Sequence, residues 1–207
     1  MARLNEKEVT LKQYKLHAKP GALDLTLCGF FAALIAIGAF IRIEIPVEPY
    51  AMHFTLQWFF VLLAGFLLGG KRAAMSVCVY LIIGLMGVPV FASGGGLAYL
   101  IRPTFGFLLG FALAAFVMGM MTEKRPKASF FGMLLISIAG LAAYYGIGIL
   151  YFYFISNYVI NMPVGWKVVL INCCLLTVFE DFLLCVLAAV ICNRLRPVFQ
   201  KADMMRK

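Results

Sequence analysis

Charged residues are scarce in this chain of 207 residues, and their scarcity excludes an ordinary soluble domain. Asp, Glu, Lys and Arg together make up 13% of the sequence, whereas 64% of it is hydrophobic, and the mean hydropathy is +0.97. Soluble domains are roughly half apolar and a quarter charged. Because so much apolar surface cannot be covered by so few polar residues, lipid must be the solvent for much of the chain.

Metal-binding and nucleotide-binding patterns are missing as well. The chain has only two histidines, and its six cysteines show no CxxC spacing, so nothing predicts a metal site or a disulfide framework. All six cysteines fall within apolar segments, where we expect them to serve as small buried side chains. Without a Walker A sequence, the chain is not expected to hydrolyse ATP itself. We expect no cofactor.

The apolar runs predict an all-α integral membrane protein with six transmembrane helices. Most runs approach the roughly 20 residues that a helix needs to cross the hydrocarbon layer. The second run is short, so we expect its helix to extend back into residues 52–53. The predicted spans lie near residues 25–41, 54–68, 73–88, 101–121, 128–153 and 168–192.

The basic residues predict the orientation of these spans. They give a net charge of +9 but cluster between the apolar runs, which argues against a nucleic-acid partner. Fifteen of the eighteen fall on one predicted side, and only Arg42, Arg102 and Lys167 fall on the other. By the positive-inside rule both termini are cytoplasmic. We expect one membrane domain over 23–196, preceded by a cytoplasmic tail or interfacial helix (1–22) and followed by a cytoplasmic tail (197–207).

Ionisable residues within spans are functional candidates, because they are costly in lipid unless paired or hydrated. Glu180 and Asp181 lie inside the sixth predicted span, and Arg102 lies at the outer mouth of the fourth. Asp181 precedes Arg194 by 13 residues, about 20 Å along a helix, which places it in the outer half of the bilayer. Since adjacent residues point about 100° apart, at most one of the two acids is expected to face a shared pocket.

These positions predict an outward-facing pocket for a small solute. Arg102 offers a guanidinium fork suited to a carboxylate, and Asp181 can accept hydrogen bonds from a polar head group. Trp58 and Trp166 are expected to anchor the helices at the membrane interfaces rather than to line the pocket. The other substrate-binding candidates are the glycines that allow close backbone approach and two aromatic side chains: Gly94, Gly95, Gly96, Phe91 and Tyr99.

Two other classes of function stay open on these residues. A membrane enzyme could use Glu180 and Asp181 as acid and base, although no further acids or histidines occur in spans three to five. A structural or assembly protein would be favoured if Asp181 and Arg102 paired only with protein groups.

Small residues on the first span predict a helix-packing face. Gly29/Ala33 and Ala32/Ala36 are two small-xxx-small pairs, which let another helix approach closely. The contact could be with a partner subunit or with neighbouring helices of this chain.

Three stretches resemble the BioY family, the biotin-specific substrate-capture subunits of energy-coupling factor (ECF) transporters. They are FAALIAIGAF at 31–40, HFTLQWFFVLLAGFLLGGK at 53–71 and GLMGVPVFASGGGLAYLIRPTFGFLLGF at 84–111. The resemblance implies a non-enzymatic, multi-pass protein of a prokaryotic plasma membrane that works with a transmembrane coupling subunit and two cytoplasmic ATPases. It also implies that the small-residue face of the first helix, with Ala32 and Ala36, contacts the coupling subunit.

The chain departs from the family pattern at two places. The family usually has Gly-Pro-Thr-Gly-Gly-Tyr where residues 102–107 read RPTFGF, and Pro-Gly-Asp-x-x-Lys where residues 179–184 read FEDFLL. Asp181 keeps the family's acid, Leu184 replaces its lysine, and Arg102 adds a cation nearby. The resemblance therefore implies a carboxylate-bearing vitamin as substrate, either biotin or a related compound such as lipoate.

Overall fold

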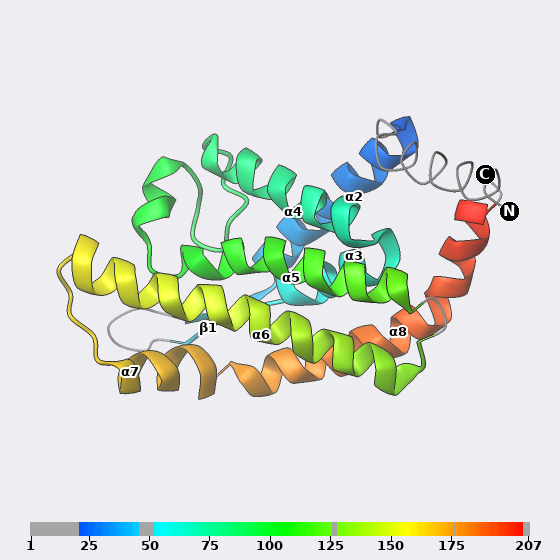
Figure 1. Ribbon diagram of the computed structural model, residues 1–207. Helices are drawn as coiled ribbons and strands as arrows, with labels where there is room; N and C mark the ends of the chain where they lie inside the picture. The colour runs from blue at the N-terminus through cyan, green and yellow to red at the C-terminus, as the bar shows by residue number, and fades with distance from the viewer. Residues whose placement is uncertain (1–20, 46–51, 126–127, 176, 205–207) are drawn as a thin grey trace, which may run out of the picture.

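Helices dominate the computed structural model, which describes residues 21–45, 52–125, 128–175 and 177–204. The helices lie side by side along one long axis (Figure 1). In chain order the elements are α2 (Ala22–Phe40), β1 (Arg42–Ile45), β2 (Met52–Thr55), α3 (Gln57–Leu68), α4 (Gly70–Leu85), η1 (Leu97–Ile101), α5 (Phe105–Lys124), α6 (Phe130–Phe154), η2 (Ile155–Val159), α7 (Trp166–Leu170), η3 (Ile171–Leu175) and α8 (Val178–Met204).

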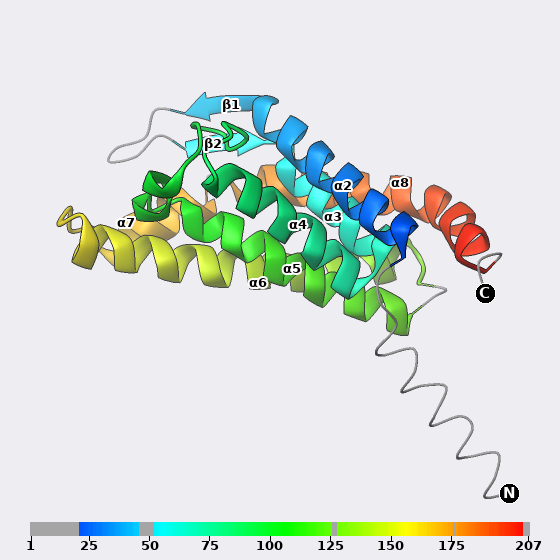
Figure 2. The same cartoon turned by 90° about the horizontal axis from the view of Figure 1, so that it is seen from above.

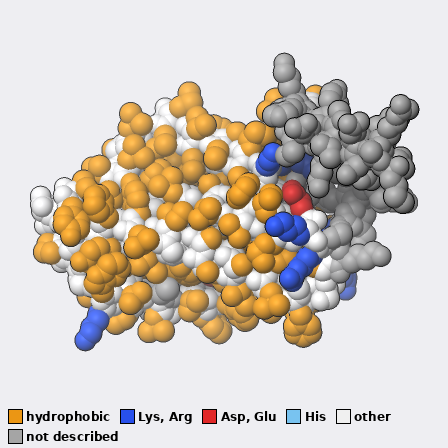
Figure 3. Space-filling view, viewed as in Figure 1, with side chains coloured by type: hydrophobic (Ala, Val, Ile, Leu, Met, Phe, Trp, Pro, Cys, Tyr) orange, Lys and Arg blue, Asp and Glu red, His pale blue; other side chains and the backbone are white. Residues whose placement is uncertain are grey.

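The outer surface of the bundle is suited to lipid. Within the described residues, three helical stretches are long and apolar enough to cross a membrane: Ala22–Phe40, Phe105–Lys124 and Phe130–Val159. Large apolar side chains such as Leu135, Leu150 and Phe179 are 60–71% exposed. Figure 3 shows hydrophobic side chains over most of the visible face. The expectation of a mostly helical membrane protein is confirmed.

One end of the bundle gathers charged groups that tie helix ends together. The Arg72 guanidinium at the start of α4 lies 3.1 Å from the Asp24 carboxylate at the start of α2. The backbone N–H of Gly70 donates to the Glu123 carboxylate at 2.9 Å. Arg196 on α8 is buried and donates to backbone carbonyls at the end of α5. We call this the basic end, and Figure 3 shows most of the visible Lys and Arg there.

The opposite end carries an antiparallel hairpin that the sequence patterns did not predict. Arg42 of β1 pairs with Thr55 of β2, and Ile45 pairs with Met52. The hairpin lies beside the loop that follows α4 (Figure 2). The expected extension of the second span into residues 52–53 is therefore wrong, because these residues pair as a strand and α3 begins at Gln57. Residues 46–51, which connect the two strands, lie outside the described residues.

Several predicted helix boundaries also change. The break expected at residues 69–72, between the second and third predicted spans, consists only of Gly69, which has φ +82°. Helix α4 begins at the next residue, Gly70. The sixth predicted span, 168–192, is not one helix but α7, η3 and α8 in succession. Its predicted end near residue 192 is wrong too, because α8 continues to Met204. The tail predicted from 197 is thus helical over its first part, and the predicted tail 1–22 is described only for its last two residues.

The core contains an aromatic stack that binds three helices together. Trp58 on α3 is 1% exposed and stacks on Phe111 of α5 and Tyr144 of α6, with ring centroids 5.9 and 5.0 Å away. The expectation that Trp58 anchors the chain at a membrane interface is therefore wrong. Trp166, the first residue of α7, is 46% exposed, and its ring stacks on that of Tyr153 in α6 with ring centroids 3.9 Å apart.

Candidate functional site

A cavity of about 660 Å³ opens at the hairpin end of the bundle. Its volume falls within the roughly 300–1,000 Å³ usual for small-molecule sites. Segments far apart in the sequence build it: the hairpin, the loop after α4, η1 with the turn before α5, and the segment after η2. The lining residues are Glu44, His53, Ser93, Ala98, Ile101, Arg102, Pro103, Thr104, Ile160 and Met162.

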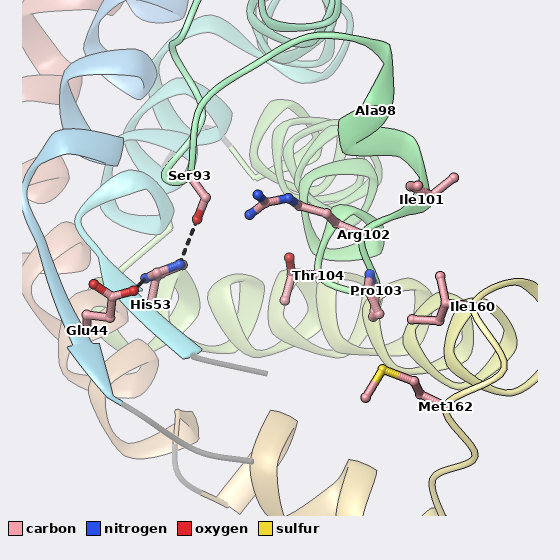
Figure 4. A pocket seen from close by; sticks show the side chains of 10 residues that line it. All are labelled: Glu44, His53, Ser93, Ala98, Ile101, Arg102, Pro103, Thr104, Ile160 and Met162. Atoms are coloured by element: carbon pink, nitrogen blue, oxygen red, sulfur yellow. Dashed lines mark hydrogen bonds and ion pairs between the residues drawn. The ribbon is translucent and has the colours of Figure 1, made fainter. Parts of the chain in front are cut away.

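The polar and apolar lining residues separate into different parts of the cavity (Figure 4). His53, Ser93 and the guanidinium end of Arg102 point toward the same space, with the Thr104 side chain near it. Ile101, Ile160 and Met162 lie together on the other side. A ligand that matches this lining has a charged or polar group at one end and an apolar body.

His53 connects the hairpin to the loop after α4. Its Nε2 atom lies 2.7 Å from Ser93 Oγ, and its Nδ1 atom lies 3.7 Å from a carboxylate oxygen of Glu44. Burial lowers the pKa of the His53 imidazole below its ordinary value. The Glu44 carboxylate opposes this shift, and the guanidinium groups of Arg42 and Arg102 add to it. The imidazole is therefore held toward its neutral form.

Arg102 is held in the cavity by the turn between η1 and α5. Its backbone N–H donates to the Tyr99 carbonyl at 3.1 Å, and its own carbonyl accepts from the Phe105 N–H at 3.0 Å. The guanidinium carbon lies 5.1 Å from the centre of the Tyr99 ring, within cation–π range. The guanidinium group thus rests on an aromatic face and keeps its N–H donors for a ligand in the cavity.

An aromatic cluster supports the turn that carries Arg102. The ring of Phe91 lies 4.6 Å from that of Tyr99 and 6.2 Å from that of Phe105, centre to centre. Phe91 is 1% exposed and Tyr99 is 5% exposed. Both predicted site aromatics therefore lie beneath the cavity wall, where they fix Arg102 in place instead of forming the cavity surface.

The three predicted site glycines form a fixed turn next to this cluster. Gly94 and Gly96 have φ of +114° and +93°, which other L-residues adopt only at a cost. Gly94 exchanges two backbone hydrogen bonds with Phe91, and the Gly96 N–H donates to the Gly84 carbonyl at 2.8 Å. A Cβ on Gly95 would lie 2.3 Å from the Val88 carbonyl oxygen. The glycines are thus required by the path of the loop that presents Ser93.

Asp181 lies at a second polar position, deeper in the bundle. It is 5% exposed in the first turn of α8, where the helix dipole favours negative charge. The Tyr145 hydroxyl of α6 lies 2.5 Å from its carboxylate and 2.7 Å from the hydroxyl of Thr177. Glu180, its neighbour, is only half-buried. Of the two acids, Asp181 is the one that faces the interior.

Arg102 and Asp181 do not line the same described cavity. The Tyr151 hydroxyl of α6 donates to the carbonyl of Leu100 in η1. Tyr151 therefore lies at about the same depth in the bundle as η1. Tyr145, which binds Asp181, lies one and a half turns earlier on α6, about 9 Å farther along the axis. Phe107 lies near this deeper level, with its ring centre 6.2 Å from that of Tyr145. The two predicted polar positions are therefore stacked in depth along α6.

The small residues of α2 divide between two faces. Ala32 is 4% exposed and belongs to the hydrophobic core, and Ala36 packs partly against the same core. Gly29 and Ala33 are exposed, and a Cβ on Gly29 would meet no atom within 4 Å. The prediction that Ala32 belongs to an outward partner face is therefore corrected, because that side chain packs within the chain. The Gly29/Ala33 pair remains accessible.

The sequence patterns do not single out four polar lining residues: Glu44, His53, Ser93 and Thr104. The predicted helix extension includes His53, and Glu44 falls between the first two predicted spans. Alternation over two strands of only four residues is too short to reveal them. One signal was available. His53 is one of only two histidines in the chain, and it stands between apolar segments.

Together the fold and the site define a multi-pass helical membrane protein with a solute-sized cavity at one end. The sequence model described as the BioY family matches residues 8–201. The chain belongs to the BioY family.

Similar proteins support this assignment. The chain is 42% identical over 180 residues to a probable biotin transporter BioY of Lysinibacillus sphaericus, covering 87% of this chain and 90% of that protein. It is 42% identical over 139 residues to the biotin transporter BioY of Thermotoga maritima, covering 67% of this chain and 76% of that protein.

A solved structure has the same fold. It is the crystal structure of the S-component for biotin from an ECF-type ABC transporter, with a TM-score of 0.72 and 29% sequence identity. The match covers 84% of this chain and 90% of the solved chain. The overall fold of this chain therefore matches that of an S-component for biotin.

Proposed function

We propose that this protein is the substrate-capture subunit of an ECF-type importer in a prokaryotic plasma membrane, and that its substrate is biotin. The observation that carries the proposal is the cavity at the hairpin end, with Arg102 aimed into it, in a fold shared with an S-component for biotin. The names of the relatives are those of transporters, so the alternative of a membrane enzyme built on Glu180 and Asp181 has no support from them.

The proposed topology has six crossings and both termini on the cytoplasmic side. The start of α2, the α3–α4 turn, the end of α5 and the distal part of α8 meet at the basic end through the contacts of Arg72, Glu123 and Arg196. This agrees with the excess of Lys and Arg at the segments predicted to be cytoplasmic. The six crossings are α2, α3, α4, α5, α6 and the α7–α8 segment, and they make up one domain over 23–196.

Helix α3 is the shortest of the proposed crossings. With 12 residues, α3 spans about 18 Å, whereas the hydrocarbon layer is about 30 Å thick. Ten of its twelve residues, including both ends, are buried, so its ends are surrounded by other parts of the chain rather than by lipid.

Within the cavity, we assign Arg102 to the carboxylate of biotin. A guanidinium group binds a carboxylate through two parallel hydrogen bonds, and this arginine keeps its donors free of acid partners in the described residues. The apolar side formed by Ile101, Ile160 and Met162 suits the hydrocarbon chain of the vitamin.

We assign Asp181 to the ureido group at the other end of biotin. Its carboxylate accepts N–H hydrogen bonds, and its depth of about 9 Å below η1 matches an elongated ligand that enters with its ring first. Phe107 and Tyr145 lie near this position. Gly94, Gly95, Gly96, Phe91 and Tyr99 shape the wall, and Glu180 lies beside Asp181. Lipoate, which has a carboxylate but no ureido group, would use Arg102 without Asp181.

The proposed partners are a transmembrane coupling subunit and two cytoplasmic ATPases. The chain lacks a Walker A sequence, so the energy for import must come from other subunits. The exposed side of α2 carries Gly29 and Ala33 next to the large apolar residues Phe30 and Ile37. A small-residue groove flanked by large side chains suits close packing against a helix of the coupling subunit.

A ligand screen by thermal unfolding tests the proposed substrate. A ligand that binds only the folded protein raises the apparent stability in proportion to the logarithm of its concentration over Kd. We expect biotin to raise the melting temperature of the purified protein and lipoate to raise it less. A larger shift with lipoate would keep the transport role and change the substrate. No shift with either carboxylate would contradict the proposal.

A further inference from the structure

The cavity contains a chain of three polar side chains contributed by three different segments. Glu44 comes from β1, His53 from β2 and Ser93 from the loop after α4, and the imidazole lies between the other two (Figure 4). The Nε2 atom is hydrogen-bonded to Ser93, but the Nδ1 atom is buried without a hydrogen-bond partner in the described residues. An N–H on Nδ1 would point toward the Glu44 carboxylate, 3.7 Å away.

Three segments surround the His53 ring, and two of them contribute charged side chains. Glu44 and Arg42 belong to the paired strand β1, Arg102 belongs to the turn before α5, and the loop after α4 contributes only the neutral Ser93. The two guanidinium groups and burial favour the neutral imidazole, and Glu44 alone favours the charged one. This balance favours the neutral ring, which carries a single N–H and so donates through only one of its two nitrogens.

We propose that His53 is a ligand-positioning residue that takes up a proton when an anionic ligand binds beside Arg102. This inference rests on the proposed function, since it uses the carboxylate assigned to Arg102. A carboxylate in the cavity cancels the repulsion between Arg102 and an imidazolium and adds an attraction of its own. The doubly protonated ring then donates through Nε2 to Ser93 and through Nδ1 to Glu44, and it ties β1, β2 and the loop around the ligand.

The sign of the pH dependence follows from this linkage. The ligand raises the pKa of His53 above its value in the empty protein, so the added affinity is fully present below the pKa of the empty state. It is lost as the pH rises through the pKa of the bound state. For one proton, the dissociation constant rises at most about ten-fold per pH unit. The ligand carboxylate stays ionised across this range, because carboxylic acids titrate near pH 4.

Magnetic resonance of labelled histidine measures this proton directly. The chain has only two histidines, so a His17→Gln background leaves the His53 ring as the one imidazole signal. We expect this ring to titrate below the ordinary histidine pKa in the empty protein and to shift upward on addition of biotin. A titration that biotin leaves unchanged, or shifts downward, would overturn the proposal.

Calorimetry in buffers of different ionisation enthalpy counts the protons taken up with the ligand. We expect wild type to take up a fraction of one proton per biotin between about pH 5 and 8. His53→Gln should take up none and bind with an affinity independent of pH, while His17→Gln should behave as wild type. Biotin binding without proton uptake in wild type contradicts this inference alone. Absence of biotin binding at any pH contradicts the proposed function as well.

Discussion

The Tyr145 hydroxyl on α6 donates to the Asp181 carboxylate on α8 across a distance of 2.5 Å, and both side chains are at least nine-tenths buried. This contact links two helices that are far apart in the sequence at the deeper of the two polar positions. Thr177 extends it by a hydroxyl contact of 2.7 Å to Tyr145 and a hydrogen bond to the Cys173 carbonyl. Asp181 is therefore oriented before any ligand arrives.

Replacing Tyr145→Phe should lower both stability and biotin affinity. The change leaves a buried carboxyl group without its hydroxyl donor, which costs about 1–3 kcal/mol. Thermal unfolding in detergent should show a lower melting temperature, and biotin titration a higher Kd. Tyr158→Phe is the matched control, because Tyr158 is 68% exposed. Equal melting temperatures for the two variants would contradict the role given to Tyr145.

Replacing Arg102→Gln should weaken the binding of biotin about 10- to 100-fold. Hydrogen bonds to a charged partner are worth about 1.5–3 kcal/mol, and every 1.4 kcal/mol is a factor of ten in Kd. The loss should be much smaller for biotin amide, which has no carboxylate. Arg194→Gln, at an exposed position of α8 away from the cavity, is the control. An equal loss for biotin and its amide would show that Arg102 does not bind the carboxylate.

Replacing Gly96→Ala should destabilise the protein by about 1–2 kcal/mol. The alanine would have to adopt φ of +93°, where its Cβ meets the backbone. Gly146→Ala in α6 should have no such cost, since its Cβ meets no atom within 4 Å and its φ is not positive. Thermal unfolding compares the two. A Gly96→Ala protein as stable as Gly146→Ala would mean that the loop can take another path.

Replacing Ala33→Trp should abolish biotin uptake in cells that contain the complete transporter while leaving biotin binding by the purified protein intact. The bulky ring would block the exposed face of α2 on which we place the coupling subunit. Leu135→Trp, at a 60% exposed position on α6, should leave uptake unchanged. Ala32→Trp should instead impair folding, because Ala32 lies in the core. Normal uptake by Ala33→Trp would remove α2 from the interface.

The sequence predicts the helices of this fold well, because lipid requires long apolar runs that composition reveals directly. It predicts the segments between the helices less well. The strands around Glu44 and His53 have four residues each, and no periodicity distinguishes them from a loop. The apolar pattern does not reveal the interruption before α8, because the segments on both sides of it are equally apolar.

The site residues, too, are predicted well in some respects and poorly in others. Asp181 and Arg102 stand out because charge is costly in lipid, and both lie at polar positions in the structure. The pattern could not show that Phe91 and Tyr99 lie behind Arg102, since depth depends on tertiary packing. Nor could it separate Ala32 from Ala33, because small residues cover more than one side of α2.

Equilibrium binding of radiolabelled biotin to the purified chain tests the central claim most directly. The account predicts saturable binding of one biotin per chain, competed by excess unlabelled biotin and weakened by both Arg102→Gln and Asp181→Asn. Binding that is absent, or that both variants leave at the wild-type Kd, would contradict it.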